Sequence, residues 1–426
     1  MLDLLVTEPP EDADYRRGHK HPFLAAELIG CEVPQVLQAI LDDPELISLC
    51  FSLLSAPSLN LTLAGYFSKL FHILTSKYFP RMLEVLCAEE HTLLSRLLAQ
   101  VGARSIADCV LKVLTYEEGE VYVAERREIV ERLVVQVGAG GEQGGNAVSI
   151  LSECLQKSGE LRAWKDIFAA VFSPSTLMSL LQNLSKDSLS SVRHSLTLLT
   201  LILSHPLCSE LLCDALPQLA ETLEGSMPVL EGLMEQGSIG ETTVGSLQTV
   251  GEIRLTCVEL LWGIYRADIK ELEGVLGRSK LPRLATGLFF EHSWNSFLHQ
   301  TYLQLVQSVL NCSEIQLKGL FLRSSGLAPR LIEWRTETTL NSGKSLRSGN
   351  MGHAIRIGQA LSRALEASPD LRTAADIGPA WDSFVADVLN PILELENRSY
   401  GGSKPTDTIE DDSDDHIDIK EEANST

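Results

Sequence analysis

Leucine-rich stripes with the spacing of an α-helix recur along most of the chain. Within residues 89–102, EEHTLLSRLLAQVG, the apolar residues follow an i, i+1, i+4, i+5, i+8 pattern. Residues 185–206, SKDSLSSVRHSLTLLTLILSHP, repeat this pattern and end in a His-Pro pair, which stops a helix. Three candidate N-caps precede the second stripe: Ser185, Asp187 and Ser188. Each stripe can bury one face of a helix against another helix, which indicates a helix-on-helix architecture.

Turn-forming residues separate the stripes every ~15 to 25 positions, which is typical of helix pairs stacked in a solenoid. An apolar fraction of 44% with only 6% aromatic residues also favours helices over a sheet. No strict sequence repeat is present, so tetratricopeptide and ankyrin arrays are disfavoured. The sequence therefore predicts an all-α fold, an irregular armadillo-like or HEAT-like helical-repeat solenoid over residues 1–398.

The charge balance limits the class of partner. The chain carries 35 Lys and Arg residues against 57 Asp and Glu residues, a formal charge of −22. Nucleic acids and anionic membranes both attract basic surfaces, so neither is expected as a partner. No run reaches ~18 consecutive apolar residues, and the first residues lack the basic segment and cleavage site of a signal peptide. We expect a protein of the cytoplasm or the nucleus.

The cysteines give no sign of disulfides or of a metal centre. Nine of them occur singly on the apolar stripes, and the chain contains no CxxC pair. This usage is typical of reduced thiols that pack as small apolar side chains in the core.

Four segments interrupt the helical pattern. Three of them, residues 137–147, 224–252 and 335–350, are rich in glycine or polar residues and are expected to be loops between helices. Residues 399–426 carry nine carboxylates against two lysines. With so little apolar surface to bury, this last segment is predicted to be a disordered acidic tail.

No catalytic motif is present. The glycines between positions 138 and 145 follow an apolar run as a phosphate-binding loop would, but Gln143 stands where GxGxxG needs its third glycine and no GK[ST] directly follows these glycines. HExxH, GxSxG and DxDxDG are absent as well. We therefore expect no catalytic, cofactor-binding or metal-binding residues and no enzymatic activity.

Residues 288–299, LFFEHSWNSFLH, gather polar and aromatic side chains at the head of an apolar segment. His292 and His299 lie seven positions apart, about two helical turns, whereas a chelating pair needs i, i+4 spacing. A structural role is therefore favoured over metal binding. We expect helix caps at Ser293 or Asn295 and buried anchors at Trp294, Phe297 and Leu298.

Eight blocks carry a family resemblance: HPFLAAELI (21–29), LAGYFSKLFHIL (63–74), LLAQVGARSIADCVLKVL (97–114), IVERLVVQV (129–137), EIRLTCVELL (252–261), LFFEHSWNSFLH (288–299), NMGHAIRIGQAL (350–361) and WDSFVADVL (381–389). In this order they resemble the SAPS domain. That family comprises regulatory subunits of the protein phosphatase 6 type catalytic subunit, the Sit-four-associated proteins of yeast among them.

The resemblance implies candidate partner-binding residues. The family's FFSK element falls on residues 66–69, its WNxFLH element on 294–299 and its MGH element on 351–353. The candidates are His21, Pro22, Phe23, Glu27, Phe67, Ser68, Lys69, Arg254, Trp294, Asn295, His299, Gly352 and His353. Asn295 and His299, four residues apart, share a helix face, where they either meet a partner or satisfy neighbouring helix ends.

The sequence departs from the family pattern at three places. Tyr66 replaces the first Phe of the FFSK element, and Asn350 precedes Met351 where an aromatic residue is usual. The family's EEPP-like element, here TEPPEDAD, begins only at residue 7, so we expect either that the N-terminal helices of the family are missing or that the start of the sequence is misassigned.

The resemblance also implies a function. It indicates a non-catalytic scaffold that binds a serine/threonine phosphatase catalytic subunit of the protein phosphatase 6 type and directs it to substrates or to an ankyrin-repeat subunit. The two-metal chemistry would belong to that partner. A helical-repeat adaptor for trafficking or nuclear transport is the alternative, because it would have the same fold without the phosphatase.

Overall fold

The computed structural model describes residues 1–116, 122–159, 163–212, 216–242, 245–334, 337–339 and 345–398. The chain divides into two compact units, Met1–Ile377 and Gly378–Thr426. Over the described residues both units are helical, and the first also carries two short hairpins, which confirms the predicted all-α class.

Local side chains fix where helices begin. The Asn60 side chain accepts hydrogen bonds from the backbone N–H groups of Thr62 and Leu63 at 3.1 and 3.2 Å. Of the three candidate caps before residue 189, Ser188 is the one used, since its Oγ accepts from the N–H of Ser191 at 3.3 Å. Such caps satisfy N–H groups that the first helical turn leaves without a partner.

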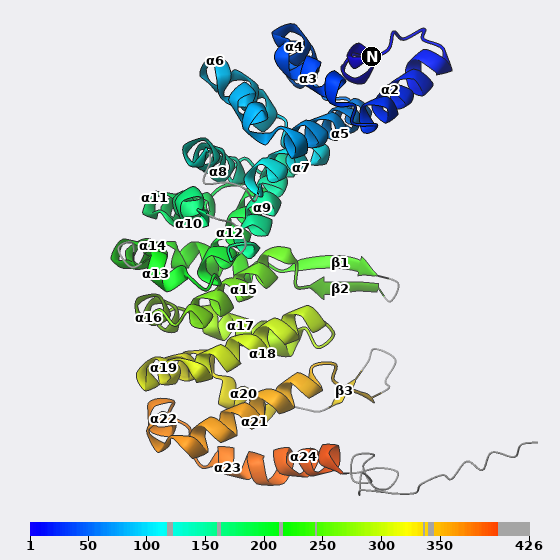
Figure 1. Cartoon of the computed structure of the whole chain (residues 1–426). Helices are drawn as coiled ribbons and strands as arrows, with labels where there is room; N and C mark the ends of the chain where they lie inside the picture. The colour runs from blue at the N-terminus through cyan, green and yellow to red at the C-terminus, as the bar shows by residue number, and fades with distance from the viewer. Residues whose placement is uncertain are drawn as a thin grey trace, which may run out of the picture. The chain divides into compact units, whose positions relative to one another are not determined.

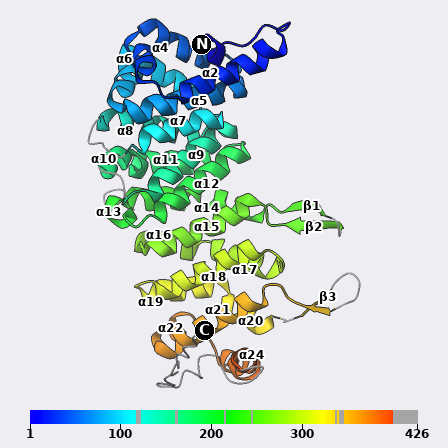
Figure 2. The ribbon, with the colours of Figure 1, turned by 45° about the vertical axis from the view of Figure 1, so that its right-hand side comes forward.

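One row of helices, row A, runs through the first unit, and each member packs against the next (Figure 1, Figure 2). Row A contains α2 (His21–Gly30), α5 (Leu61–Lys77), α7 (Arg104–Leu114), α9 (Gly141–Gln156), α12 (Leu189–Leu203), α15 (Glu252–Ala267), α18 (Ser296–Asn311) and α21 (Met351–Ala367).

A second row, row B, covers one side of row A, so that the unit is a two-layered stack of helix pairs. It contains α6 (Phe79–Ala99), α8 (Val123–Val137), α11 (Pro174–Asn183), α14 (Leu216–Glu235), α16 (Lys270–Arg278), α19 (Ile315–Ser325) and α22 (Pro369–Ala374). Two layers repeated along the chain confirm the predicted helical-repeat solenoid.

Shorter helices connect the rows and begin the first unit: α1 (Leu2–Val6), the π-helical turn η1 (Arg16–Lys20), α3 (Pro34–Asp42), α4 (Pro44–Ser52), η2 (Leu53–Ser55), α10 (Trp164–Phe168), η3 (Ala169–Phe172), α13 (Cys208–Leu212), α17 (Leu281–Glu291) and α20 (Leu327–Glu333). The second unit contains α23 (Ala380–Phe384), the π-helical turn η4 (Val385–Leu389) and α24 (Asn390–Asn397).

The core is apolar, with a few buried polar links. Near the N-terminus Phe51 packs edge-on against Phe67, with ring centroids 5.3 Å apart. Farther along, the hydroxyl groups of Thr286 and Tyr302 form a buried hydrogen bond of 2.6 Å that joins α17 to α18. Apolar packing supplies the stability, and such paired polar groups fix how neighbouring helices align with each other.

Two antiparallel hairpins project from the first unit (Figure 1). In one, β1 (Ser238–Thr242) pairs with β2 (Gly245–Thr249), with Ser238 opposite Thr249. In the other, β3 (Glu337–Thr339) pairs with β4 (Ser345–Arg347). Each hairpin directly precedes a row A helix, α15 and α21 respectively. Each hairpin therefore lies at the N-terminal end of its own helix.

The prediction of a loop over residues 137–147 is wrong for most of that range, because α9 already begins at Gly141. Its glycines serve close packing. A Cβ on Gly144 would lie 2.8 Å from Nδ1 of His194 and 3.0 Å from the carbonyl oxygen of Val137. The glycines therefore allow α9 to approach α12 and the end of α8 more closely than larger residues would permit.

The other two expected loops are partly confirmed. Residues 224–235 continue α14, because a helix tolerates the glycines there, and only the following residues leave the helical rows to form the β1–β2 hairpin. Within 335–350, the described residues form the β3–β4 hairpin and the turn that leads into α21.

The cysteines that the structure describes are free thiols, and most are buried, as expected. Cys31 is exposed and Cys87 half-buried, while Cys213 falls outside the described residues. In the part of the chain that the structure describes, no single helix is long and apolar enough to cross a membrane. One sharply bent pair, 16–29 with 34–42, meets that criterion by length and composition only.

The predicted acidic tail, residues 399–426, lies outside the described residues. The predicted boundary after residue 398 stays a prediction, since the compact units separate at Ile377, ahead of α23.

Candidate partner-binding surface

The turn between α17 and α18 is built by a side-chain cap. Helix α17 ends at Glu291 and α18 begins at Ser296. Asn295 closes the turn, because its Oδ1 accepts a hydrogen bond of 2.9 Å from the N–H of Leu298. This confirms the expected cap and places residues 292–295 at the edge of row A, beside the hairpin ends.

Trp294 and Phe297 are exposed, with 61% and 76% of their surface accessible, so the expectation that they are buried anchors is wrong. Leu298 and Tyr302 already fill the core side of α18. Phe297 precedes Leu298 by one position, about 100° around the helix, and therefore points to solvent. Trp294 lies in the turn before the helix begins.

One edge of the Trp294 indole nevertheless lies close to the backbone at Gly349. At Gly349 a Cβ would lie 2.7 Å from Cε3 of Trp294 and 2.3 Å from the carbonyl oxygen of Ser293. Only glycine permits this approach. One part of the indole thus rests on the turn before α21 while the rest faces solvent. We call Trp294, Phe297 and Gly349 the aromatic corner.

His299 is part of the interior beneath this corner. Its side chain is 1% exposed, and Nε2 donates a hydrogen bond of 2.8 Å to the carbonyl oxygen of His292. The ring also lies 5.5 Å from that of His353. Burial lowers the pKa of all three histidines below the ordinary value, so they are neutral at physiological pH. Of the two roles considered for His299, the structure shows the internal hydrogen bond.

Asn350 joins the start of α21 to α17. It is buried, its Nδ2 donates to the carbonyl oxygen of Phe289 at 3.1 Å, and its Oδ1 accepts from the hydroxyl of Ser348 at 2.6 Å. This amide occupies the position where the family usually has an aromatic residue. Gly352 is exposed, and a Cβ there would meet nothing within 4 Å, whereas His353 is half-buried.

Arg254 is also an internal residue. It is buried, and its guanidinium donates to the carbonyl oxygens of Thr249 and Val250, the latter at 2.6 Å. Burial lowers its pKa and the nearby Glu291 partly offsets this. Arg254 therefore fastens the end of the β1–β2 hairpin to α15.

A cavity of about 880 Å³ lies beside Arg254 and Glu291. Glu291 forms an ion pair of 4.0 Å with Arg330, whose guanidinium also lies 5.4 Å from the centre of the Phe290 ring. Lining cations outnumber lining carboxylates: Arg254, Lys280, Arg283, Arg323 and Arg330 against Glu235 and Glu291. On a strongly acidic chain, this cavity is a basic depression next to the aromatic corner.

At the N-terminal end of row A, α2 presents an exposed face. His21, Phe23 and Glu27 are exposed, Phe23 with 51% of its surface, whereas Pro22 is buried. Glu27 forms an ion pair of 2.8 Å with Lys69 of α5. Two candidate residues therefore pair with each other, which links α2 to α5.

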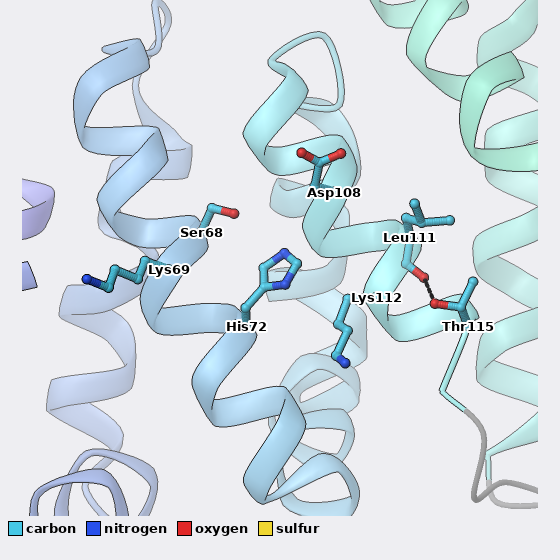
Figure 3. Close-up of a pocket in the computed structure, with 7 residues that line it drawn as sticks. All are labelled: Ser68, Lys69, His72, Asp108, Leu111, Lys112 and Thr115. Carbon is cyan, nitrogen blue, oxygen red and sulfur yellow. Dashed lines mark hydrogen bonds between the residues drawn. The ribbon is translucent and has the colours of Figure 1, made fainter. Parts of the chain in front are cut away.

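The FFSK-like element divides between core and surface. Phe67 belongs to the aromatic core described above. Ser68 lines a cavity of about 470 Å³ between α5 and α7, together with Lys69, His72, Asp108, Leu111, Lys112 and Thr115 (Figure 3). Burial and Lys112 lower the pKa of His72, and Asp108 opposes this. The sequence pattern singled out none of His72, Asp108 and Lys112.

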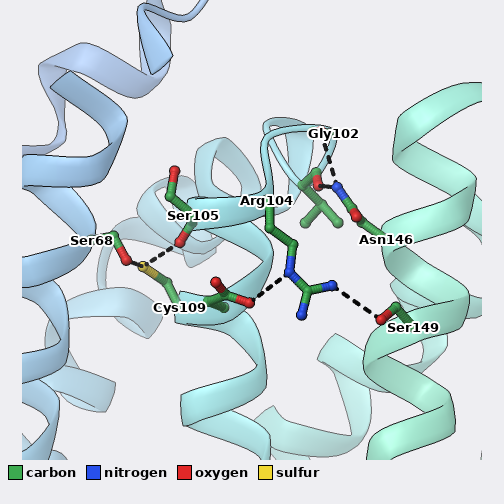
Figure 4. A network of polar contacts seen from close by, with 9 residues as sticks. Ser68, Gly102, Arg104, Ser105, Cys109, Asn146 and Ser149 are labelled. Atoms are coloured by element: carbon green, nitrogen blue, oxygen red, sulfur yellow. Dashed lines mark hydrogen bonds and ion pairs between the residues drawn. The ribbon is translucent and has the colours of Figure 1, made fainter. Parts of the chain in front are cut away.

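Polar side chains bridge α5, α7 and α9 around this element (Figure 4). The Cys109 thiol donates to the hydroxyl of Ser68 at 3.4 Å, and burial raises the pKa of that thiol to about 12. Arg104 donates to the hydroxyl of Ser149 at 3.1 Å. Ser68 thus has a structural partner as well as a place in the cavity wall.

Comparison with known proteins shows what the chain resembles. Residues 275–398, which contain the aromatic corner, match the SAPS family, described as SIT4 phosphatase-associated protein.

Curated proteins that are similar to the chain align with nearly all of it. Serine/threonine-protein phosphatase 6 regulatory subunit 3-A of Xenopus laevis is 24% identical over 99% of the chain and 56% of its own length. Regulatory subunit 1 of Mus musculus is 25% identical over 100% of the chain and 57% of its own length. Regulatory subunit 2 of Homo sapiens is 23% identical over 91% of the chain. The chain therefore spans about half the length of these curated relatives.

Among solved structures, an engineered protein aligns with 93% of this chain and 98% of its own at 14% identity and a TM-score of 0.37. Similarity at this level carries no argument about fold or function.

The candidate residues lie at two separate places on row A. One group belongs to α2 and α5, the other to α15, α18 and α21, with α7, α9 and α12 between them (Figure 1). The second group alone falls mainly within the residues that match the family, and it includes the large exposed aromatic residues Trp294 and Phe297.

Proposed function

We propose that this chain is a non-catalytic regulatory subunit that binds a serine/threonine phosphatase catalytic subunit of the protein phosphatase 6 type and directs its activity. The observation that carries the proposal is the similarity over almost the full chain to proteins named as protein phosphatase 6 regulatory subunits. The stacked helices support it, because extended solenoid surfaces are suited to holding other proteins.

We further propose that the aromatic corner is the docking point. Tryptophan is the residue most enriched at the centres of protein interfaces, where it supplies a large contact area at little cost in conformational entropy. One edge of the Trp294 indole lies close to Gly349, which supports an ordered side chain before any partner arrives. A preordered exposed aromatic side chain loses less entropy on binding than a mobile one.

The basic cavity beside the corner would add electrostatic selection. Arg283 and Arg323 line it near the ion-paired Arg330. A partner surface with carboxylates opposite these cations would be drawn toward the aromatic corner, because complementary charge raises the association rate and fixes orientation. The phosphoryl chemistry would belong to the metal ions of the catalytic subunit. An ankyrin-repeat subunit would be a second partner, and the complex would act in the cytoplasm or nucleus.

Co-purification tests this function. The tagged full chain, expressed in its native cell, is captured and its associated proteins are identified by mass spectrometry and by phosphatase assay. We expect a protein phosphatase 6 type catalytic subunit in near-stoichiometric amount. Capture of transport factors without a phosphatase would instead support the adaptor alternative and reject the proposal.

A further inference from the structure

Three side chains with metal-ligating atoms meet where two helix pairs join. Asp268 follows the end of α15, Glu273 lies in the first turn of α16, and Cys312 follows the end of α18. One ligand atom from each lies within 4.8 Å of the other two. These residues are up to 44 positions apart in the sequence, so the fold alone brings them together.

Glu273 is buried without adequate hydrogen-bond partners. Its side chain is 1% exposed, and neither carboxylate oxygen has a hydrogen-bond partner among the described residues. The neighbouring Tyr265 hydroxyl is also buried and without one. The Cys312 thiol lies against this carboxyl and interacts with it, and it also donates a hydrogen bond of 3.4 Å to the carbonyl oxygen of Ser308. A buried carboxylate with unmet capacity is costly unless something of opposite charge or a proton accompanies it.

The surrounding charges leave this cluster negative. Lys270 is the nearest cation on α16, and it forms an ion pair of 2.5 Å with Glu314. Lys318 acts on Cys312 from α19. Asp268 accepts a hydrogen bond of 3.0 Å from the N–H of Ser313, which holds its carboxylate beside Cys312. Asp268 and Glu273 therefore face Lys270 and Lys318, and Lys270 is already paired with Glu314.

We propose that Asp268, Glu273 and Cys312 form a zinc site. A thiolate with two carboxylates is a ligand set for zinc rather than for magnesium or calcium, which take oxygen ligands only. Bonds of about 2.0 to 2.3 Å in a tetrahedron put ligand atoms about 3.5 Å apart, so the three atoms need to close by little more than about 1 Å. Water would complete the tetrahedron, and the Tyr265 hydroxyl is placed to hydrogen-bond to a ligand oxygen.

Binding would be a balanced exchange. The zinc ion would enter as Zn²⁺, the Cys312 thiol would lose its proton to solvent, and three ligand bonds would form without any change of oxidation state. The ion would then join the α15–α16 turn to the α18–α19 turn. Because α18 is about 24 Å long, this clamp lies at the opposite end of that helix from the aromatic corner. The site is therefore independent of the docking proposal.

Metal analysis of the full chain tests the site. The protein is purified without chelator and its zinc is measured by plasma mass spectrometry, before and after a chelator and zinc readdition. We expect about one zinc per chain, a lower melting temperature after chelation and recovery with zinc. Cobalt substitution should give the near-ultraviolet absorption band of a thiolate–cobalt bond.

Two variants and a matched control locate the ion. Asp268 is exposed, and an asparagine there can still accept the hydrogen bond from Ser313, so the Asp268→Asn variant should fold. It should weaken zinc binding at least about 10-fold. Cys312→Ser should remove the cobalt–thiolate band. Glu271 is an exposed acid on the same turn, and Glu271→Gln should change neither the zinc affinity nor the cobalt–thiolate band. The proposal is overturned if the wild-type chain holds no zinc and does not respond to it, or if both variants retain zinc at wild-type affinity.

Discussion

At the scale of single residues, Trp294 combines exposure with a fixed position. Its indole rests against Gly349 and otherwise faces solvent. We predict that Trp294→Ala changes the free energy of unfolding by no more than about 0.5 kcal/mol, as exposed truncations usually do. Urea denaturation measures this. Phe289→Ala, a fully buried aromatic residue on α17, serves as the contrast and should cost about 3 to 5 kcal/mol. A comparable loss in both variants would mean that Trp294 is a core residue.

His299 should behave in the opposite way. His299→Ala removes a buried ring and its hydrogen bond to the carbonyl oxygen of His292, so we predict a loss of about 1 to 3 kcal/mol. The cost should depend on pH. Burial lowers the folded-state pKa of His299, while the unfolded chain protonates it below about 6.5. Its contribution is therefore complete above that pH and declines as the pH falls.

The measurement compares wild type and His299→Ala by chemical denaturation at about pH 7.5 and about pH 5.5. The difference between them should be larger at the higher pH. A difference that grows as the pH falls would show that the folded state prefers the protonated ring, contrary to its burial.

At the scale of elements, the cap on α18 is the feature that sets the corner. Asn295→Ala leaves the N–H of Leu298 without its partner at 2.9 Å. Loss of an N-cap typically costs about 1 kcal/mol, and Asn295→Asp, which keeps an acceptor oxygen, should restore most of it. Thermal unfolding of the three proteins tests this. Equal melting temperatures for wild type and Asn295→Ala would show that the Asn295 cap does not stabilise the protein.

Helices were predictable from the sequence because each one carries its own apolar stripe and end signals, as α12 shows with Ser188 and the His-Pro pair. The glycine-rich start of α9 was not predictable from the sequence. Gly144 packs against His194, which lies on a different helix 50 positions later. Contacts of that kind are set by tertiary packing. The structural role of Arg254 was missed for another reason: its partners Thr249 and Val250 are near in sequence, but they accept through backbone carbonyl oxygens, which carry no side-chain signal.

The site was predictable in part. The WNxFLH element was identified from its residues, and its cap at Asn295 followed from helix-start chemistry. The burial of Trp294 was predicted wrongly, because the indole precedes the helix and helical periodicity does not reach it. The buried state of His299 was left open, since two residues on one helix face do not show which face another helix covers.

At the scale of the whole molecule, we expect the acidic C-terminal segment to be dispensable for folding and for partner binding. Residues 405–426 carry little apolar surface to offset the entropy of ordering them. We predict that deleting them leaves the melting temperature and the capture of the catalytic subunit nearly unchanged. Calorimetry and pull-down of the truncated chain are the measurements. A melting temperature lower by several degrees would show that this segment packs against the helices.

The most direct test of the central claim is the affinity of the purified catalytic subunit for the intact chain and for a Trp294→Ala, Phe297→Ala double variant, measured by biolayer interferometry. Val135→Ala, an exposed apolar truncation on row B, is the matched control. We predict that the wild-type chain and the control bind alike, while the double variant loses at least about 30-fold in affinity, which corresponds to about 2 kcal/mol, and keeps its melting temperature. Wild-type affinity in the double variant, or no binding by the wild-type chain, would contradict the account.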